Sequence, residues 1–182
     1  TVSSEGVTQL RARCKDNANN QSAVVQQEVK LDKPAPVVVI SLAGPLQNGW
    51  YNDNVTTTIT ATDGGSGVHS VDYDLNNGNW QAYTSPFILS QNGSTIVRAT
   101  ATDNAGNQSD PVTQLVKIDK IAPTTTISTK GKSYRSSYIT DVTVTLTGVD
   151  NNGGSGIQRI EYDLNDNIWK PYTGQFVISV NG

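Results

Sequence analysis

The sequence predicts an all-β protein built from tandem β-sandwich repeats of about 87–89 residues. The first observation is an internal repeat: residues 98–123 (RATATDNAGNQSDPVTQLVKIDKIAP) align without a gap to residues 11–36, and 16 of 26 positions are identical. A self-match at a fixed period is the signature of a repeat array. The second observation is a period-two alternation over residues 55–62 (VTTTITAT), which is typical of half-buried strands. The third is that no segment has a convincing helical period.

The repeat is circularly offset within the chain. Residues 1–36 match 88–123, and residues 124–182 match 37–93. The chain therefore begins and ends at the same phase, marked by Gly6 and Gly182. The predicted domains are, in order, the C-terminal half of a repeat (1–33), a complete repeat (34–120) and the N-terminal half of a repeat (121–182).

Seven short strands separated by turn signals indicate a β-sandwich for the complete repeat. The alternation places Val71, Tyr73 and Leu75 inward and Asp72 and Asp74 outward. The residues NNGN (76–79) predict a hairpin turn, since Asn and Gly tolerate positive φ. The other residues expected inward are Val55, Thr57, Ile59, Ala61, Val97, Ala99 and Ala101. The expected strands are 37–42, 55–62, 68–75, 80–84, 87–90, 95–102 and 112–118.

The later copy keeps the same pattern. Val142, Val144 and Leu146 are expected inward, and so are Ile160, Tyr162 and Leu164. Cys14, the only cysteine, replaces Ala101 at an inward position, so we expect a small buried side chain. Aromatic residues recur in both copies, which favours the core over a sugar-stacking platform. These aromatic residues are Trp80, Tyr83, Trp169 and Tyr172.

Composition excludes several classes of function. The formal charge of −3 leaves no basic footprint for nucleic acid. No apolar run approaches the roughly 20 residues of a membrane helix. A hydrophobic content of 35% suits small domains with thin cores, and the lack of Met and of a signal peptide suggests an internal or processed segment. The single His69, whose counterpart is Gln158, predicts neither a catalytic triad nor a zinc site.

The motifs resemble the Ig-like repeats of prokaryotic surface proteins, and the resemblance covers essentially the whole chain. The residues that carry it are DKIAPTTTI, GWYNDNVTTTITATDGGSGV, VDYDLNNGNWQAYTSPF and ATDNAGNQS. Asn19 in place of the turn Gly and the insertion Asn151-Asn152 are departures from the pattern. The resemblance implies an Ig-like sandwich in an extracellular spacer, an adhesin stalk or an accessory module, and it does not imply an enzyme.

The acidic residues of the turns are candidate calcium ligands, because hard cations take carboxylate and carbonyl oxygens. The competing interpretation is that Asp and Asn bond to their own backbone in turns. Asp32 and Asp119 lie in the short proline joints DKPAP (32–36) and DKIAP (119–123), where a bound ion could stiffen a semi-rigid connection. The possible calcium residues are Asp16, Asp63, Asp103, Asp119 and Asp150.

Four sequons fit glycosylation on turns of a secreted protein, although a sequence rich in Asn and Thr also produces them by chance. They begin at Asn20, Asn54, Asn92 and Asn107.

These observations predict a structural unit of an extracellular rod or filament. The two half repeats suggest head-to-tail assembly, in which the tail of one chain (1–31) supplies strands to the head of another (124–182). The first alternative is an adhesin or carbohydrate-binding module, with Trp50 and Tyr51 as an exposed contact. The second is a spacer domain within a large secreted enzyme.

Overall fold

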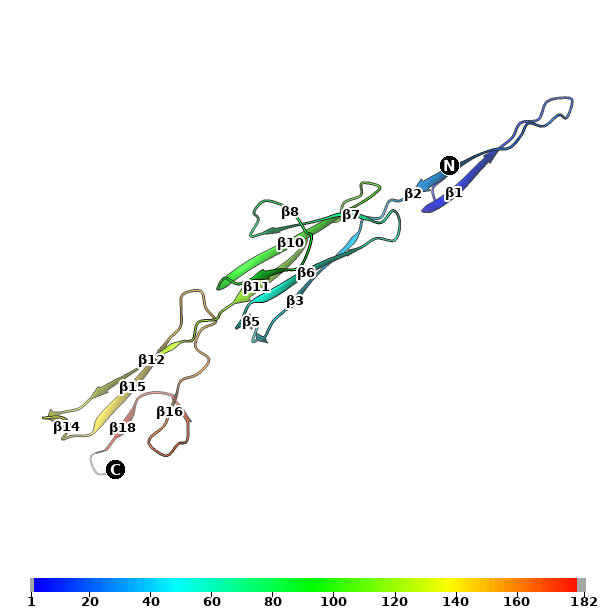
Figure 1. The fold of residues 1–182 in the computed structure, drawn as a ribbon. Coiled ribbons are helices and arrows are strands. Elements are labelled where there is room, and N and C mark those ends of the chain that lie inside the picture. Colours follow the sequence, from blue (N-terminus) through cyan, green and yellow to red (C-terminus); the bar gives the residue numbers. More distant parts are fainter. Residues whose placement is uncertain (1, 180–182) are drawn as a thin grey trace. The chain divides into compact units, whose positions relative to one another are not determined.

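The computed structural model describes residues 2–179, and every regular element among them is a β-strand (Figure 1). The all-β prediction is therefore confirmed. The strands are β1 Gly6–Ala12, β2 Val25–Leu31, β3 Val37–Ala43, β4 Leu46–Gln47, β5 Trp50–Tyr51, β6 Val55–Thr62, β7 Val68–Leu75, β8 Gln81–Ala82, β9 Phe87–Leu89, β10 Gly93–Asp103, β11 Val112–Ile118, β12 Thr124–Lys130, β13 Ser133–Tyr134, β14 Ser137–Tyr138, β15 Val142–Val149, β16 Glu161–Tyr162, β17 Lys170–Pro171 and β18 Phe176–Ile178.

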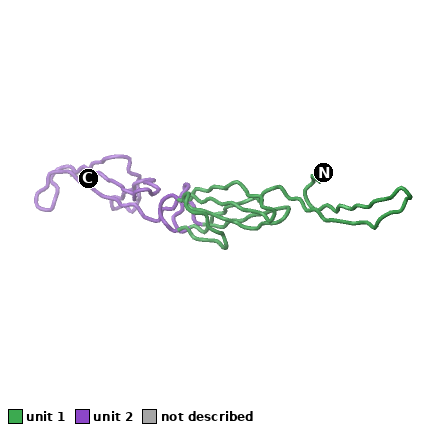
Figure 2. Tube along the Cα trace, turned by 90° about the horizontal axis from the view of Figure 1, so that it is seen from above, with its two compact units in different colours: residues 1–43, 55–89, 95–116 green, residues 44–54, 90–94, 117–182 purple. Residues whose placement is uncertain are grey.

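The strands belong to two compact units (Figure 2). Unit 1 comprises Thr1–Ala43, Val55–Leu89 and Thr95–Val116, and unit 2 comprises Gly44–Asn54, Ser90–Ser94 and Lys117–Gly182. Gly182, which marks the repeat phase in the sequence, lies outside the described residues.

Unit 1 contains two sheets consistent with a β-sandwich. One sheet has the order β3-β6-β9, and the other is the six-stranded sheet β4-β5-β11-β10-β7-β8, of which β10, β7 and β8 lie in unit 1. Ile59 of the first sheet and Ala99 and Ala101 of the second share one buried cluster, so their inward faces meet. The predicted inward faces of β6 and β10 are confirmed, since Val55, Thr57 and Val97 have no exposed surface.

Aromatic packing closes this core. Tyr73 and Phe87 stack with ring centroids 4.5 Å apart, and Tyr83 meets the edge of Phe87 at 6.4 Å. The backbone N–H of Ile59 donates to the Tyr83 hydroxyl at 3.1 Å, which ties the ring to strand β6. In unit 2, Tyr162 and Tyr172 pack against Phe176 in the same way. The core prediction for these tyrosines is confirmed.

The core prediction for the tryptophans is wrong. Trp80 is 42% exposed and Trp169 is 69% exposed. Trp80 precedes the short strand β8, directly after a turn in which Asn76 and Asn77 both have positive φ, as predicted. Its ring lies against Arg98, with the guanidinium carbon 5.2 Å from the ring centroid, and takes no part in the buried cluster.

Asp74 also departs from expectation. It was expected to face solvent, but its side chain is completely buried and forms an ion pair with Arg98 of β10. The alternation of β7 is correct, because Asp74 and Tyr73 point to opposite faces. Asp74 points to the outer face of the sheet, but Arg98 and Trp80 cover that face at this point. Its side chain is therefore buried although it lies outside the hydrophobic core.

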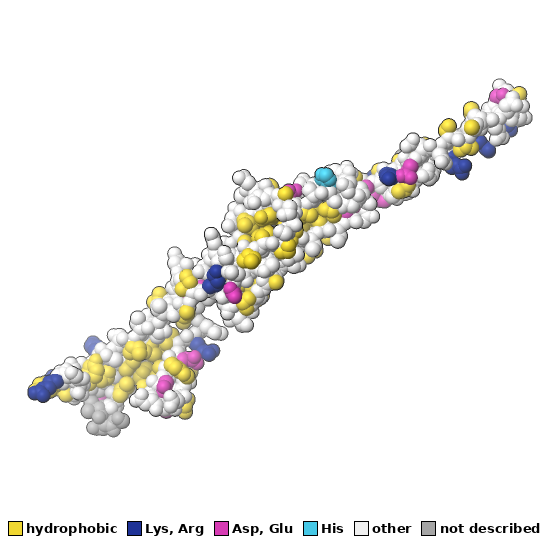
Figure 3. All heavy atoms as spheres, viewed as in Figure 1, with side chains coloured by type: hydrophobic (Ala, Val, Ile, Leu, Met, Phe, Trp, Pro, Cys, Tyr) yellow, Lys and Arg dark blue, Asp and Glu magenta, His cyan; other side chains and the backbone are white. Residues whose placement is uncertain are grey.

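Strands β1 and β2 form a hairpin that pairs antiparallel from Gly6↔Leu31 to Ala12↔Val25. Its apolar side chains lie at the surface: Leu10 is 53% exposed and Val25 is 67% exposed (Figure 3). Cys14 is exposed, so the expected burial of its side chain is wrong. Burial of Ala101, its sequence counterpart, depends on the sheet β3-β6-β9 opposite, and no such sheet covers the hairpin among the described residues.

Unit 2 contains the sheet β12-β15-β18. Its register repeats that of unit 1: Val37↔Thr62 recurs as Thr124↔Val149, and Asp72↔Ala82 recurs as Glu161↔Pro171. Pairing positions are thus offset by 87 residues before the Asn151-Asn152 insertion and by 89 after it. The buried cluster contains Val142, Val144 and Leu146, as predicted.

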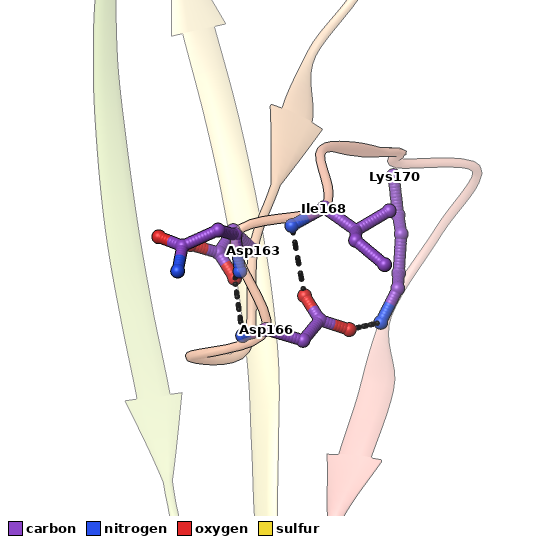
Figure 4. A network of polar contacts seen from close by, with 5 residues as sticks. Asp163, Asp166, Ile168 and Lys170 are labelled. Carbon is purple, nitrogen blue, oxygen red and sulfur yellow. Dashed lines mark hydrogen bonds and ion pairs between the residues drawn. The ribbon is translucent and has the colours of Figure 1, made fainter.

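Unit 2 differs from the prediction after β15. Leu164 is 47% exposed, so its expected inward position is wrong, and only Glu161–Tyr162 form a strand there. Asp163 and Asp166 organise the loop that follows (Figure 4). Asp166 accepts from the Ile168 N–H at 3.1 Å and pairs with Lys170 at 2.5 Å. The loop therefore satisfies its polar groups locally instead of extending the sheet.

Candidate metal site

The loop DNAGN is built on Asp103 at the end of β10. Asp103 Oδ1 accepts from the backbone N–H groups of Ala105 and Asn107 at 2.9 and 2.8 Å. Its Oδ2 accepts from the Asn107 side-chain amide at 2.8 Å. Although burial opposes ionisation, these hydrogen bonds together hold the pKa of Asp103 below its usual value. Asp103 thus remains an anion at neutral pH.

Asp16 makes the equivalent turn in the first copy. It accepts from Ala18 N at 2.9 Å, from Asn20 N at 2.8 Å and from Asn20 Nδ2 at 2.8 Å. Hydrogen bonding from Asn20 lowers the pKa of Asp16. These hydrogen bonds lie within its own turn, and among residues 2–179 Asp16 belongs to no cluster of acidic side chains.

The loop GGSG is held by two aspartates from different segments. Asp63 Oδ2 accepts from the N–H groups of Gly65 and Gly67 at 3.0 and 2.7 Å. Asp32, in the proline joint, accepts from Ser66 N at 2.5 Å. Asn104 Nδ2 donates to the carbonyls of Ser66 and Gly67 at 2.9 and 3.0 Å, which connects this loop to DNAGN.

These loops bring three carboxylates together. Asp32, Asp63 and Asp103 each place one oxygen within 4.8 Å of the others, and Asp103 is only 2% exposed. Asp32 Oδ1 is buried and has no hydrogen-bond partner. Like charges this close repel one another unless a cation compensates them. Calcium takes six to eight oxygen ligands, mainly carboxylates, carbonyls and waters, so this donor set suits it.

The joint in unit 2 repeats part of the arrangement. Asp119 Oδ2 accepts from Ser155 N at 2.7 Å, and Asp150 Oδ2 accepts from Gly156 N at 2.6 Å. With its amide nitrogen turned toward the carboxylates, Asn151 donates to Asp119 Oδ1 at 3.1 Å and to Asp150 Oδ1 at 3.0 Å. Hydrogen bonds, first from Ser155, lower the pKa of Asp119. An amide therefore lies between the carboxylates of this joint.

The predicted calcium residues consequently divide into three groups. Asp63 and Asp103 lie close to Asp32. Asp119 and Asp150 both accept hydrogen bonds from Asn151. Asp16 forms its hydrogen bonds within its own turn. The sequence placed Asp32 at a joint but did not predict that it lies beside Asp63 and Asp103, because the three carboxylates come from segments far apart in the chain. The sequence feature that could have pointed to Asp32 is the Asp-Lys pair that begins both proline joints.

The sequon side chains have mixed surroundings. Asn107 Nδ2 donates to Asp103 Oδ2 and, at 3.3 Å, to the Asp32 carbonyl, so a glycan there would have to replace both bonds. Asn20 Nδ2 is held by Asp16. Asn54 Oδ1 accepts a hydrogen bond from Lys120 Nζ at 2.8 Å, and Asn92 Oδ1 accepts one from the Lys120 backbone N–H at 2.9 Å.

Neither a known family model nor a curated protein matches this chain. The Ig-like resemblance therefore stays a prediction that depends on the motifs quoted above. Among residues 2–179, no helix has the length and apolar character needed to cross a membrane.

Proposed function

We propose that this chain is a structural segment of an extracellular rod, made of tandem Ig-like domains whose joints are fixed by aspartates. One observation carries the proposal: the joint aspartate accepts a backbone hydrogen bond from the Ser of the following GGSG loop in both units, Ser66 to Asp32 and Ser155 to Asp119. The recurring strand registers support the tandem organisation. The role is mechanical and not enzymatic.

The test is the stiffness of each joint in solution. Residual dipolar couplings of the ¹⁵N-labelled chain report the relative alignment of the sequences on either side of Asp32 and of Asp119. A common alignment that is lost in the Asp32→Ala and Asp119→Ala variants supports the proposal. Independent tumbling across both joints in the unmodified chain would refute it.

Calcium at Asp32, Asp63 and Asp103 belongs to the same proposal. The partnerless, buried Asp32 Oδ1 and the three close carboxylates support it. A ligand that binds only the native state raises the free energy of unfolding by RT ln(1 + L/Kd), where L is the free ligand concentration. Calcium is therefore expected to raise the melting temperature by several degrees, and a chelator should reverse the change. An identical melting curve with calcium and with chelator would refute this part.

Head-to-tail strand complementation is how such segments would join. In unit 1, strand β10 buries Val97 and Ala99 completely, whereas their counterparts in β1, Leu10 and Ala12, are exposed. In unit 2, Ile178 is 43% exposed where its counterpart Leu89 is 8% exposed. A hairpin with an open apolar face and a sheet with an uncovered edge invite pairing between chains.

Cys14 provides a direct probe of this pairing. Its thiol is exposed, but its counterpart Ala101 has no exposed surface. If hairpin β1–β2 of one chain docks on the sheet of another, maleimide labelling of Cys14 should slow as protein concentration rises. Deletion of residues 1–31 should abolish the association seen by light scattering. Labelling independent of concentration in a monomeric protein would contradict complementation.

A further inference from the structure

A hollow of about 440 Å³ lies beside Trp80 in unit 1. It is built from β7, β10 and the segment before β11. Its lining residues are Asp72, Trp80, Thr100, Gln108, Ser109 and Pro111. Neither the joint nor the buried core uses this hollow. An aromatic ring and a few polar groups around one concavity are the usual composition of a small-molecule site.

The Trp80 ring is held in place from one side. Arg98 lies against it at 5.2 Å, and Arg98 is itself fixed by its ion pair with the completely buried Asp74. A cation over an indole face stabilises the ring position. Trp80 as a whole residue is nevertheless 42% exposed. Trp80 is therefore a pre-positioned platform, and little rotamer freedom remains to be lost when a ligand binds.

The polar wall of the hollow is also fixed. Thr100 Oγ1 donates to the Ser109 carbonyl at 2.9 Å, and Ala101 N donates to Ser109 Oγ at 3.0 Å. A bridge between Thr102 and Gln108 keeps this segment against β10. Among the described residues, Asp72 Oδ2 accepts one long hydrogen bond, 3.3 Å from Ser70 Oγ. Asp72 therefore retains acceptor capacity beside the platform, because an ionised carboxylate has about four lone-pair sites.

We propose that this hollow binds a neutral saccharide. The apolar C–H face of a β-linked hexose would stack on Trp80, while its hydroxyls donate to Asp72 and exchange hydrogen bonds with Gln108. The Asp72 carboxylate disfavours anionic sugars, and the Arg98 guanidinium does not offset this charge because it is already paired with Asp74. A single-repeat site of this kind is weak, but repetition along a rod multiplies it through avidity.

The chain supplies its own control at Trp169. Trp169 occupies the matching position in unit 2 and is 69% exposed, with Glu161 in place of Asp72. Among the described residues of unit 2, β16 pairs only with β17, and no strand equivalent to β10 lies beside it. Trp169 is thus an exposed indole without the polar wall in the monomeric chain, and at low protein concentration it should not bind.

Single-tryptophan variants of the full chain test the proposal. Trp50→Phe with Trp169→Phe leaves Trp80 as the sole indole, and Trp50→Phe with Trp80→Phe leaves Trp169. Both are titrated with cellobiose, N,N′-diacetylchitobiose and lactose, and with sialyllactose as the anionic comparison. We expect at least one neutral disaccharide to produce a saturable change in Trp80 emission, with no change at Trp169.

Two substitutions in the unmodified background then assign the site by calorimetry. Trp80→Ala should weaken binding at least tenfold, and Asp72→Asn should weaken it several-fold while narrowing the difference between neutral and anionic sugars. If Trp80→Ala does not fold, Asp72→Asn alone decides. The proposal is overturned if no disaccharide gives a saturable signal at Trp80, if Trp169 responds equally, or if affinity survives these substitutions. The hollow is formed by residues of unit 1 alone. The result of the saccharide titrations is therefore independent of whether the joint aspartates fix the joints.

Discussion

Asp74 and Arg98 form an ion pair in which the Asp74 side chain is completely buried and the Arg98 side chain is 27% exposed. Asp74 Oδ1 and Arg98 Nε are buried without a hydrogen-bond partner. The pair lies on the outer face of the sheet beneath Trp80. It connects strands β7 and β10, which are antiparallel neighbours in one sheet.

Removing one partner of this pair should be costly. Arg98→Met leaves the Asp74 charge buried and uncompensated, and such losses destabilise by about 3–5 kcal/mol. Urea denaturation measures the change. The double variant Asp74→Leu/Arg98→Met is the control, because an apolar pair removes the orphaned charge. It should be considerably more stable than Arg98→Met, and equal instability of the two variants would contradict this account.

Two equivalent positions should respond differently to added volume. Ala101 has no exposed surface, whereas Cys14, its counterpart in the first copy, is exposed. Ala101→Leu should therefore destabilise by about 1–3 kcal/mol through overpacking. Cys14→Leu should change stability by less than about 0.5 kcal/mol in the monomer. Thermal melts at low protein concentration compare the loss of stability in the two variants. A larger loss in Cys14→Leu than in Ala101→Leu would contradict the prediction.

Adjacent glycines provide a test of the joint. A Cβ on Gly65 would collide with the Asp32 carboxylate, whereas one on Gly64 would meet nothing within 4 Å. Gly65→Ala should displace Asp32 from Ser66 N and cost about 0.5–1.5 kcal/mol, the net contribution of a typical hydrogen bond. Gly64→Ala should be close to neutral. Chemical denaturation that ranks the two variants the other way would contradict the described joint.

Acid should weaken the fold through four aspartates. The pKa values of Asp16, Asp103, Asp119 and Asp166 are lowered from 3.8 in the folded chain. A lowered folded-state pKa contributes stability that is present above the unfolded value and is lost as pH falls through the folded value. Unfolding free energy should therefore decline below about pH 4. The decline should be shallower in Asp103→Asn, and an unchanged profile would exclude Asp103 as a contributor.

Much of this fold was predictable because β-strands carry a local signal. The alternation in residues 55–62 and 68–75 predicted β6 and β7 with their observed bounds, and the expected last strand, 112–118, coincides with β11. Trp80 and Asp74 were misassigned because their environment is created by Arg98, which pairing across β7 and β10 brings near. Cys14 was misassigned because burial requires a second sheet, and a strand pattern alone does not reveal whether one is present.

The candidate metal site was predictable only as a list of acidic turns. Each turn motif identified its own aspartate, but the meeting of Asp32 with Asp63 and Asp103 depends on how the proline joint docks on two loops. Likewise, the Asn151-Asn152 insertion was visible in the sequence. Its effect, an amide placed between Asp119 and Asp150, follows only from the loop geometry.

Amide hydrogen exchange at Ser66 and Ser155 tests the central claim most directly. Both N–H groups donate to the joint aspartates, so both should exchange slowly in the unmodified chain. Asp32→Ala should accelerate exchange at Ser66 alone, and Asp119→Ala at Ser155 alone. If both amides exchange at unprotected rates in the unmodified chain, or do not respond to these substitutions, the aspartates do not fix the joints.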